Sequence, residues 1–173
     1  MGTSAWARYV DDWCRACESP LNFDVMAHPD LVMRFSKEGF APDFDPAPFW
    51  GQMAECAHDT NRRVEVSTAA PRKGLDDYYP ATGLLRCFAH AEVPITFGSD
   101  AHRACDICWN IREAQAHAYD CGYRTFDPAV PAAPAMISPG LPIQCTLPRR
   151  TTAPSDQRST KGLQPSYQSH SKP

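Results

Sequence analysis

The chain has 173 residues, of which 43% are hydrophobic and 21% are charged, and its formal net charge is -3. This length allows one domain with a core of useful size, and the charge balance gives no support to a surface for nucleic acid or anionic membranes. No apolar run approaches the roughly 18 residues that cross a bilayer, and residues 1–13 lack the order of a signal peptide, so we expect a cytoplasmic protein without a membrane partner.

The first part of the chain alternates between helical and extended patterns. Apolar side chains recur at helical spacing over residues 5–18 and 48–60, which predicts two amphipathic helices. Residues 23–27 and 63–67 have the composition of short strands. After residues 31–34 comes a polar loop, in which Pro42, Pro46 and Pro48 oppose regular structure.

The same alternation continues toward residue 127. Residues 69–74 read as a loop, 82–91 as a helix, 95–97 as a strand, 105–120 as a helix that ends before Gly122, and 123–126 as a last strand. Repeated helices and strands predict an α/β layer or barrel with parallel strands. Because chemistry in such folds gathers at the carboxyl ends of the strands, residues that follow the strands are candidates for a site.

Asp100 and His102 follow the strand at 95–97 and are two residues apart. In extended backbone such residues project to the same side, so they could converge on one cation, and their oxygen and nitrogen ligands suit Zn²⁺, Mn²⁺ or Fe²⁺. The alternative is that Asp100 caps the following helix and His102 is a surface residue. His28 and Asp30 follow the first strand and residues 67–73 follow the second, which favours a site shared by three strand ends.

Eight cysteines in a chain without an export signal are expected to be reduced thiols. Cys14 with Cys17, and Cys105 with Cys108, have the spacing of zinc knuckles. Both pairs also fall in predicted helices, where residues three apart merely share a face. A zinc-stabilised binding module built on these four cysteines is therefore an alternative of a different class.

Residues 128–173 differ in composition from the rest. Nine of the 17 prolines lie there, among Ser, Thr and Gln, with hardly any apolar periodicity. Such a segment cannot bury enough apolar surface to offset the entropy of ordering. We therefore predict a folded domain over residues 1–127 and a Pro/Ser/Thr-rich disordered tail over 128–173.

Four motifs in order resemble the histidinol-phosphatase branch of the PHP (polymerase and histidinol phosphatase) family: FDVMAHPDLVMR at 23–34, VEVSTAAPRK at 64–73, YP at 79–80 and GSDAH at 98–102. The resemblance covers about residues 8–127. It implies a distorted, TIM-like (β/α)₇ barrel with parallel strands, whose first strand carries a His-x-His pair. This chain has no such pair, so we expect the carboxyl-terminal portion of the barrel, with a possible dependence on an N-terminal segment.

The resemblance also implies a metal-dependent hydrolysis of a small phosphate monoester, histidinol phosphate, in histidine biosynthesis. Divalent zinc, manganese or iron would activate a water, and His28, Asp100 and His102 would be ligands. A full polynuclear cluster would need the upstream ligands as well. Asp30 could orient the His28 imidazole, since metal-bound histidines usually donate their other N–H to an acceptor.

Arginine side chains are the first candidates for binding the substrate phosphate. The planar guanidinium groups of Arg34 and Arg72 can each offer two parallel donors to it, and Lys73 and Ser67 are weaker candidates. A solvated Arg34 at a helix start is the competing interpretation.

Glu65 alternates with Val64 and Val66, so it points to the opposite face and could enter the barrel interior. There it could bind the amine of an amino-alcohol substrate or pair with an arginine. His58, His90 and His117 lie on predicted helices and are treated as ordinary surface or rim residues. Besides an active hydrolase, a truncated and catalytically silent fragment of the same barrel is consistent with these features.

Overall fold

Three parallel strands form the central sheet in the computed structural model, which describes residues 2–127 and 135–136. They are β1 (Val25–Met26), β2 (Arg63–Ser67) and β3 (Ile95–Gly98), in the order β1-β2-β3. Val64 is in register with Met26 on one side and with Ile95 on the other. The predicted α/β class with parallel strands is confirmed, while closure into a barrel stays a prediction.

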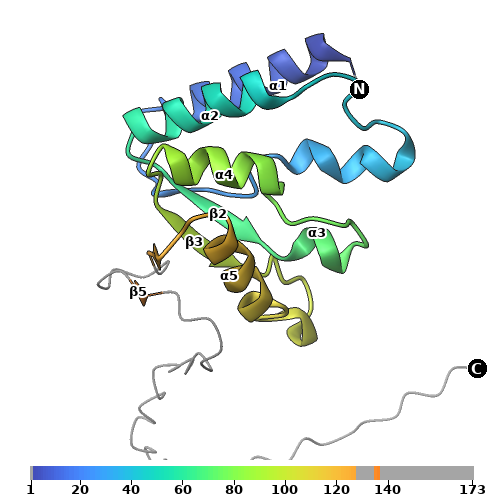
Figure 1. Cartoon of the computed structure of the whole chain (residues 1–173), viewed down its shortest axis with the longest axis vertical. Coiled ribbons are helices and arrows are strands. Elements are labelled where there is room, and N and C mark those ends of the chain that lie inside the picture. Colours follow the sequence, from blue (N-terminus) through green and yellow to red (C-terminus); the bar gives the residue numbers. More distant parts are fainter. Residues whose placement is uncertain (1, 128–134, 137–173) are drawn as a thin grey trace, which may run out of the picture. The chain divides into compact units, whose positions relative to one another are not determined.

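Three helices lie on the same side of this sheet (Figure 1): α1 (Thr3–Cys17), α2 (Ala47–Asp59) and α4 (Thr82–His90). Helix α1 packs against α2, and α2 packs against α4. All three were predicted to within two residues at each end, because each carries an apolar stripe at helical spacing. Their buried side chains include Trp6, Val10, Trp13, Met53, Leu84 and Phe88.

The two faces of the sheet differ in chemistry. Val64, Val66 and Ile95 are fully buried members of the core that the helices share. Glu65 and Thr96 are a registered pair on the opposite face, because successive side chains of a strand alternate. A polar face therefore lies opposite the helix layer.

Two short helices overlap segments that were predicted as loops, at residues 35–38 in one case and 69–72 in the other. The 3-10 helix η1 (Leu31–Glu38) follows β1 and ends at Gly39, whose φ of +87° favours glycine. Helix α3 (Ala69–Arg72) follows β2 and is a single turn. The loop prediction failed at η1 because eight residues in a 3-10 conformation lack the 3.6-residue periodicity by which helices are recognised.

The predicted helix over 105–120 is interrupted. Only η2 (Ala104–Asp106) and α5 (Ile111–Asp120) are helical, and α5 packs against β3. Cys108 and Asn110 between them have φ of +60° and +58°, a left-handed conformation that a right-handed helix cannot include. The helix prediction was therefore wrong for residues 107–110.

The strand predicted at 123–126 is β4 (Thr125–Phe126), which pairs antiparallel with β5 (Ala135–Met136). Next to β4, the N–H of Asp127 donates to the carbonyl oxygen of Ile95 at 2.7 Å, which joins this segment to β3. Strand β5 falls inside the segment predicted to be disordered, and the rest of that segment, 128–134 and 137–173, lies outside the described residues. Among the residues that are described, no helix has the length and apolar character needed to cross a membrane.

Candidate functional site

Glu65 on β2 reaches the residue that follows β1. Its Oε2 accepts a hydrogen bond from the backbone N–H of His28 at 3.0 Å, and its carboxylate lies against Gly98, where a Cβ atom would overlap it. Burial raises the pKa of Glu65, and the His28 N–H partly opposes that shift. This carboxylate therefore connects the middle of β2 with the residue that follows β1 and with the last residue of β3, on the face opposite Val64 and Val66 as predicted.

His28 and Asp100 have strained backbones. Their φ values are +30° and +46°, in the region that non-glycine residues seldom adopt. Each residue lies just beyond the carboxyl end of a strand, β1 or β3. Strain of this kind, of order 1–3 kcal/mol per residue, is concentrated at functional sites, and here it falls on two of the three predicted metal ligands.

The imidazole of His102 is held by the backbone of Asp100. Its Nδ1 lies 2.8 Å from the Asp100 carbonyl oxygen and 3.8 Å from the Asp100 Oδ1. The other carboxylate oxygen, Oδ2, lies 3.7 Å from Nζ of Lys73. The His102 side chain is 77% exposed, so its Nε2 is open to a ligand from solvent.

The donor chemistry of this pair fits a divalent cation, since a carboxylate and an imidazole are common ligands of zinc and of transition metals. Residues 2–127 and 135–136 nevertheless contain no group of three or more His, Cys, Asp or Glu side chains arranged to hold a metal ion. Thus His28 is not gathered with Asp100 and His102 into a complete ligand set in this part of the chain. The metal site stays a prediction in which Asp100 and His102 form one side.

Arg72 binds the turn that carries Asp100. Its Nη1 donates to the Ser99 carbonyl oxygen at 2.6 Å and its Nη2 to that of Asp100 at 2.7 Å, while its Nε lies 3.7 Å from the carboxylate of Asp106. Two of its donors therefore hold backbone oxygens of the turn. Arg34, the other predicted phosphate-binding arginine, is exposed and lies over the ring of Phe35.

Asp30 and Ser67 are fully buried. The Oδ2 of Asp30 accepts the N–H of Ala81 at 2.8 Å, and burial raises the pKa of Asp30 to about 7. Asp30 thus contacts the segment that begins α4. The predicted partner was the imidazole of His28. The Ser67 Oγ accepts the N–H of Ala69 at 3.3 Å, so it supports the start of α3.

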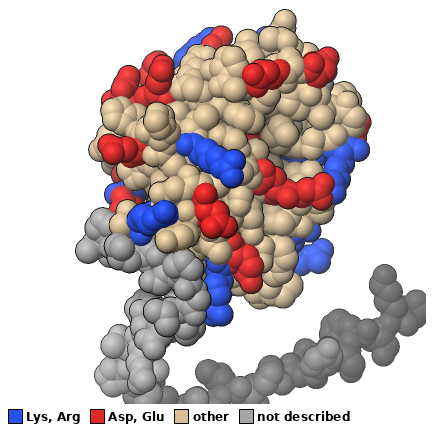
Figure 2. Space-filling view, in the orientation of Figure 1, with Lys and Arg blue, Asp and Glu red and all other residues tan. Residues whose placement is uncertain are grey.

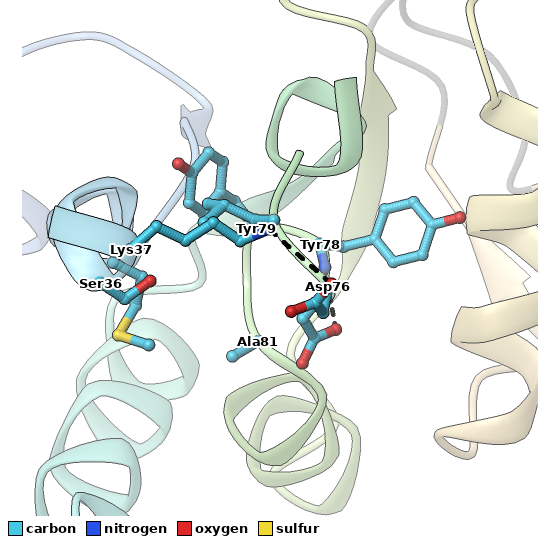
Figure 3. A pocket seen from close by; sticks show the side chains of 9 residues that line it. Ser36, Lys37, Asp76, Tyr78, Tyr79 and Ala81 are labelled. Atoms are coloured by element: carbon cyan, nitrogen blue, oxygen red, sulfur yellow. Dashed lines mark hydrogen bonds and ion pairs between the residues drawn. The ribbon is translucent and has the colours of Figure 1, made fainter. Parts of the chain in front are cut away.

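A pocket of about 340 Å³ lies between η1 and the segment before α4 (Figure 3). Lys37 reaches across it toward Asp76, with 3.9 Å between Nζ and Oδ1, and Tyr79 forms part of its wall. The Tyr79 hydroxyl and the Oδ1 of Asp30 are buried and have no hydrogen-bond partner within the described range. Burial raises the pKa of Tyr79 to about 12, and the Asp30 carboxylate adds to the shift, so this hydroxyl is a neutral donor near pH 7.

One polar cluster was missed by the sequence analysis. The imidazole of His117 on α5 stacks on the ring of Tyr78, with 4.9 Å between the ring centroids. Its Nε2 lies 3.8 Å from Oδ1 of Asp77. Asp77 also accepts the backbone N–H and the hydroxyl of Thr82, at 2.7 and 2.9 Å. His117 therefore joins α5 to the start of α4, and an aspartate shortly before a predicted helix was the available signal.

The four cysteines of the two CxxC pairs have different surroundings. Cys14 and Cys17 are buried on α1, and Cys56 of α2 contributes to a rise in the pKa of both thiols to about 12, after the larger effect of burial. Cys105 and Cys108 are exposed beyond β3. Together with the absence of a group of three or more ligands in the described residues, this arrangement does not support the zinc-stabilised module.

Neither positive nor negative side chains dominate the visible face of the molecule. Acidic and basic side chains are interspersed there among larger uncharged areas (Figure 2).

Comparison with known proteins supports the resemblance seen in the motifs. No family model matches the chain. Over 104 residues, which are 60% of this chain and 38% of the relative, it is 30% identical to the probable histidinol-phosphatase of Deinococcus radiodurans. The crystal structure of hisK from Listeria monocytogenes, an inferred histidinol phosphatase, is similar in fold, with a TM-score of 0.56 and 20% identity over 63% of this chain and 43% of that chain.

The chain is thus similar to histidinol phosphatases, as the four motifs predicted. It spans about two fifths of the length of both relatives.

Proposed function

We propose that this chain is the carboxyl-terminal portion of a metal-dependent phosphate-monoester hydrolase of the histidinol-phosphatase type, built on a TIM-like barrel. The substrate would be histidinol phosphate, converted to histidinol and phosphate in the cytoplasm. The observation that carries the proposal is the arrangement of Asp100 and His102 at the carboxyl end of a parallel strand, in a chain similar to histidinol phosphatases.

Three side chains are proposed as metal ligands: His28, Asp100 and His102. Bound zinc, manganese or iron would supply a hydroxide near neutral pH by lowering the pKa of a bound water. Asp100 would contribute a carboxylate whose Oδ2 also faces Nζ of Lys73 at 3.7 Å. The Glu65 carboxylate accepts a hydrogen bond from the backbone N–H of His28 and so fixes the backbone at that residue. Hydrolysis would break the bond between phosphorus and the alcohol oxygen, and the oxygen of water would remain on phosphate.

Other side chains are proposed to bind the substrate. Arg34 is exposed and can offer two parallel N–H donors to a phosphate, while Lys73 and the remaining N–H groups of Arg72 lie beside Asp100. Ser67 is a weaker candidate because its hydroxyl is buried. Glu65 lies on the polar face and is the candidate partner for the amine of histidinol phosphate.

A second candidate is a catalytically silent portion of the same barrel. It is favoured by the observation that the described residues hold no group of three or more metal ligands.

Phosphate release from histidinol phosphate by the purified chain, loaded with Zn²⁺, Mn²⁺ or Fe²⁺, tests the proposal. We expect turnover that Asp100→Asn abolishes and that His58→Ala, an exposed histidine of α2, leaves unchanged. If no metal gives turnover, the amino-terminal part of the Deinococcus relative is added as a separate chain. Turnover only in that mixture would support the silent portion, and no turnover in either case would overturn the active hydrolase.

A further inference from the structure

Three hydrogen bonds converge on the turn that follows β3. Arg72 donates to the carbonyl oxygens of Ser99 and Asp100 at 2.6 and 2.7 Å, and His102 Nδ1 lies 2.8 Å from the same Asp100 oxygen. A carbonyl oxygen has two lone pairs, so it can accept from both donors at once. The guanidinium of Arg72 and the imidazole of His102 are therefore linked through one atom.

This link determines which nitrogen of His102 carries hydrogen. A carbonyl oxygen only accepts, so Nδ1 must be the protonated nitrogen for the 2.8 Å contact to be a hydrogen bond. In the neutral imidazole the lone pair is then on Nε2. When one ring nitrogen of a histidine donates a hydrogen bond, a metal binds the other nitrogen. Here Nδ1 donates, so Nε2 is the nitrogen that is free to bind a metal.

The turn needs support because its backbone is strained. Asp100 has a φ of +46°, and without an external partner its carbonyl oxygen could turn away from His102. The planar fork of a guanidinium matches two adjacent oxygens, whereas a lysine ammonium is a single point of charge. Arg72 is itself held, since its Nε lies 3.7 Å from Asp106 and its side chain is only 17% exposed.

We propose that Arg72 is a positioning residue that fixes His102 in the Nδ1–H tautomer, through the Asp100 carbonyl oxygen, so that Nε2 is presented to a divalent cation such as Zn²⁺. This role is separate from any contact of Arg72 with phosphate. The part that concerns the cation rests on the proposed function, whereas the part that concerns the tautomer does not.

The tautomer is measured by long-range ¹H–¹⁵N NMR of the imidazole groups in the metal-free chain, about two pH units above the ordinary imidazole pKa of about 6.5. His102→Gln assigns the signals. We expect a protonated Nδ1 and an unprotonated Nε2 for His102, and averaged signals of exchanging tautomers in Arg72→Lys. Arg124→Lys is the matched control, because Arg124 also donates to two backbone carbonyl oxygens, those of Tyr119 and Tyr123.

Zinc affinity, measured by competition with a chromophoric chelator, is the second readout. Arg72→Lys should weaken it about 10–100-fold, as expected when a group that orients a ligand is lost, and Arg124→Lys should leave it unchanged. A predominantly Nε2–H tautomer in the unmodified chain would overturn the proposal without any variant, even if Arg72→Lys does not fold. An unchanged His102 spectrum in folded Arg72→Lys would overturn it as well. Absence of zinc binding in the unmodified chain would refute the proposed function and the cation part, while the tautomer result would still decide the positioning role.

Discussion

The carboxylate of Glu65 fills the space beside Gly98 that a side chain at position 98 would need. Gly98→Ala should therefore displace the carboxylate and break its hydrogen bond with the His28 N–H. We expect a loss of about 1–3 kcal/mol in the free energy of unfolding, as for other overpacked sites. Urea unfolding followed by circular dichroism measures it.

Two further variants test the cause of that loss. Gly51→Ala lies within α2, where an added Cβ meets no atom within 4 Å, and it should stabilise by up to about 1 kcal/mol through helix propensity. In the double variant Glu65→Ala/Gly98→Ala, the loss in the free energy of unfolding should be smaller than the sum of the losses in the two single variants. Full additivity would contradict the overlap.

Arg62 connects the segment after α1 with the start of β2. Its guanidinium donates to the carbonyl oxygens of Cys17, Ser19 and Phe23, and lies 3.9 Å from the centre of the Phe23 ring. Arg62→Ala removes a charged donor from several carbonyl oxygens, so the free energy of unfolding should fall by roughly 2–3 kcal/mol. Thermal unfolding is the measurement, and Arg8→Ala, an exposed arginine of α1, should change it by less than about 0.5 kcal/mol. Equal effects of the two variants would contradict the connecting role.

Asp77 and Asp76 are neighbours with very different exposure. Asp77 accepts the first N–H of α4 and the Thr82 hydroxyl, whereas the Asp76 side chain is 99% exposed. Asp77→Ala should destabilise the chain by about 1 kcal/mol or somewhat more, like the loss of a helix cap, and Asp76→Ala should have little effect. Thermal unfolding of the two variants gives the comparison, and a larger loss for Asp76→Ala would refute the capping role.

The cysteines should fall into two reactivity classes. Burial raises the pKa of Cys14 and Cys17 to about 12, so their thiols stay protonated at pH 8 and their thiolate fraction rises about tenfold with each pH unit below that value. Alkylation by iodoacetamide, followed by mass spectrometry, should label exposed Cys105 and Cys108 first. Labelling of Cys14 and Cys17 should be at least about 100-fold faster after unfolding in urea than in the native chain. Rapid native labelling of Cys14 at pH 8 would contradict the buried packing of α1 against α2.

Periodicity predicted most of the fold. The apolar stripes of α1, α2 and α4 and the alternation in β2 are local patterns, so the sequence was sufficient to place them. The interruption at Cys108 and Asn110 had only a weak signal, because asparagine tolerates the left-handed conformation but does not require it, and neither residue is a glycine or proline. Closure of the sheet depends on contacts between distant segments, which periodicity does not report.

The sequence predicted where the residues of the candidate site lie better than it predicted which partners they contact. Placing Glu65 opposite Val64 and Val66 followed from strand alternation, and the structure confirms it. The partners of Arg72 could not be predicted, because they are backbone oxygens that become available only when the strained turn at Asp100 forms. The His117 contact with Asp77 likewise depends on where the tertiary fold places α5 relative to the segment before α4, and residues 40 positions apart leave no short pattern for such a contact.

The difference between the two faces of the sheet also protects the chain from mispairing. If β2 shifted by one residue against β3, Arg63 and Glu65 would enter the apolar layer, while Val64 and Val66 would turn to the polar face. The Glu65 carboxylate would then lose both the His28 N–H and its place beside Gly98. A slipped strand is therefore penalised on both faces at once, so the alternation within five residues of β2 selects one alignment during folding.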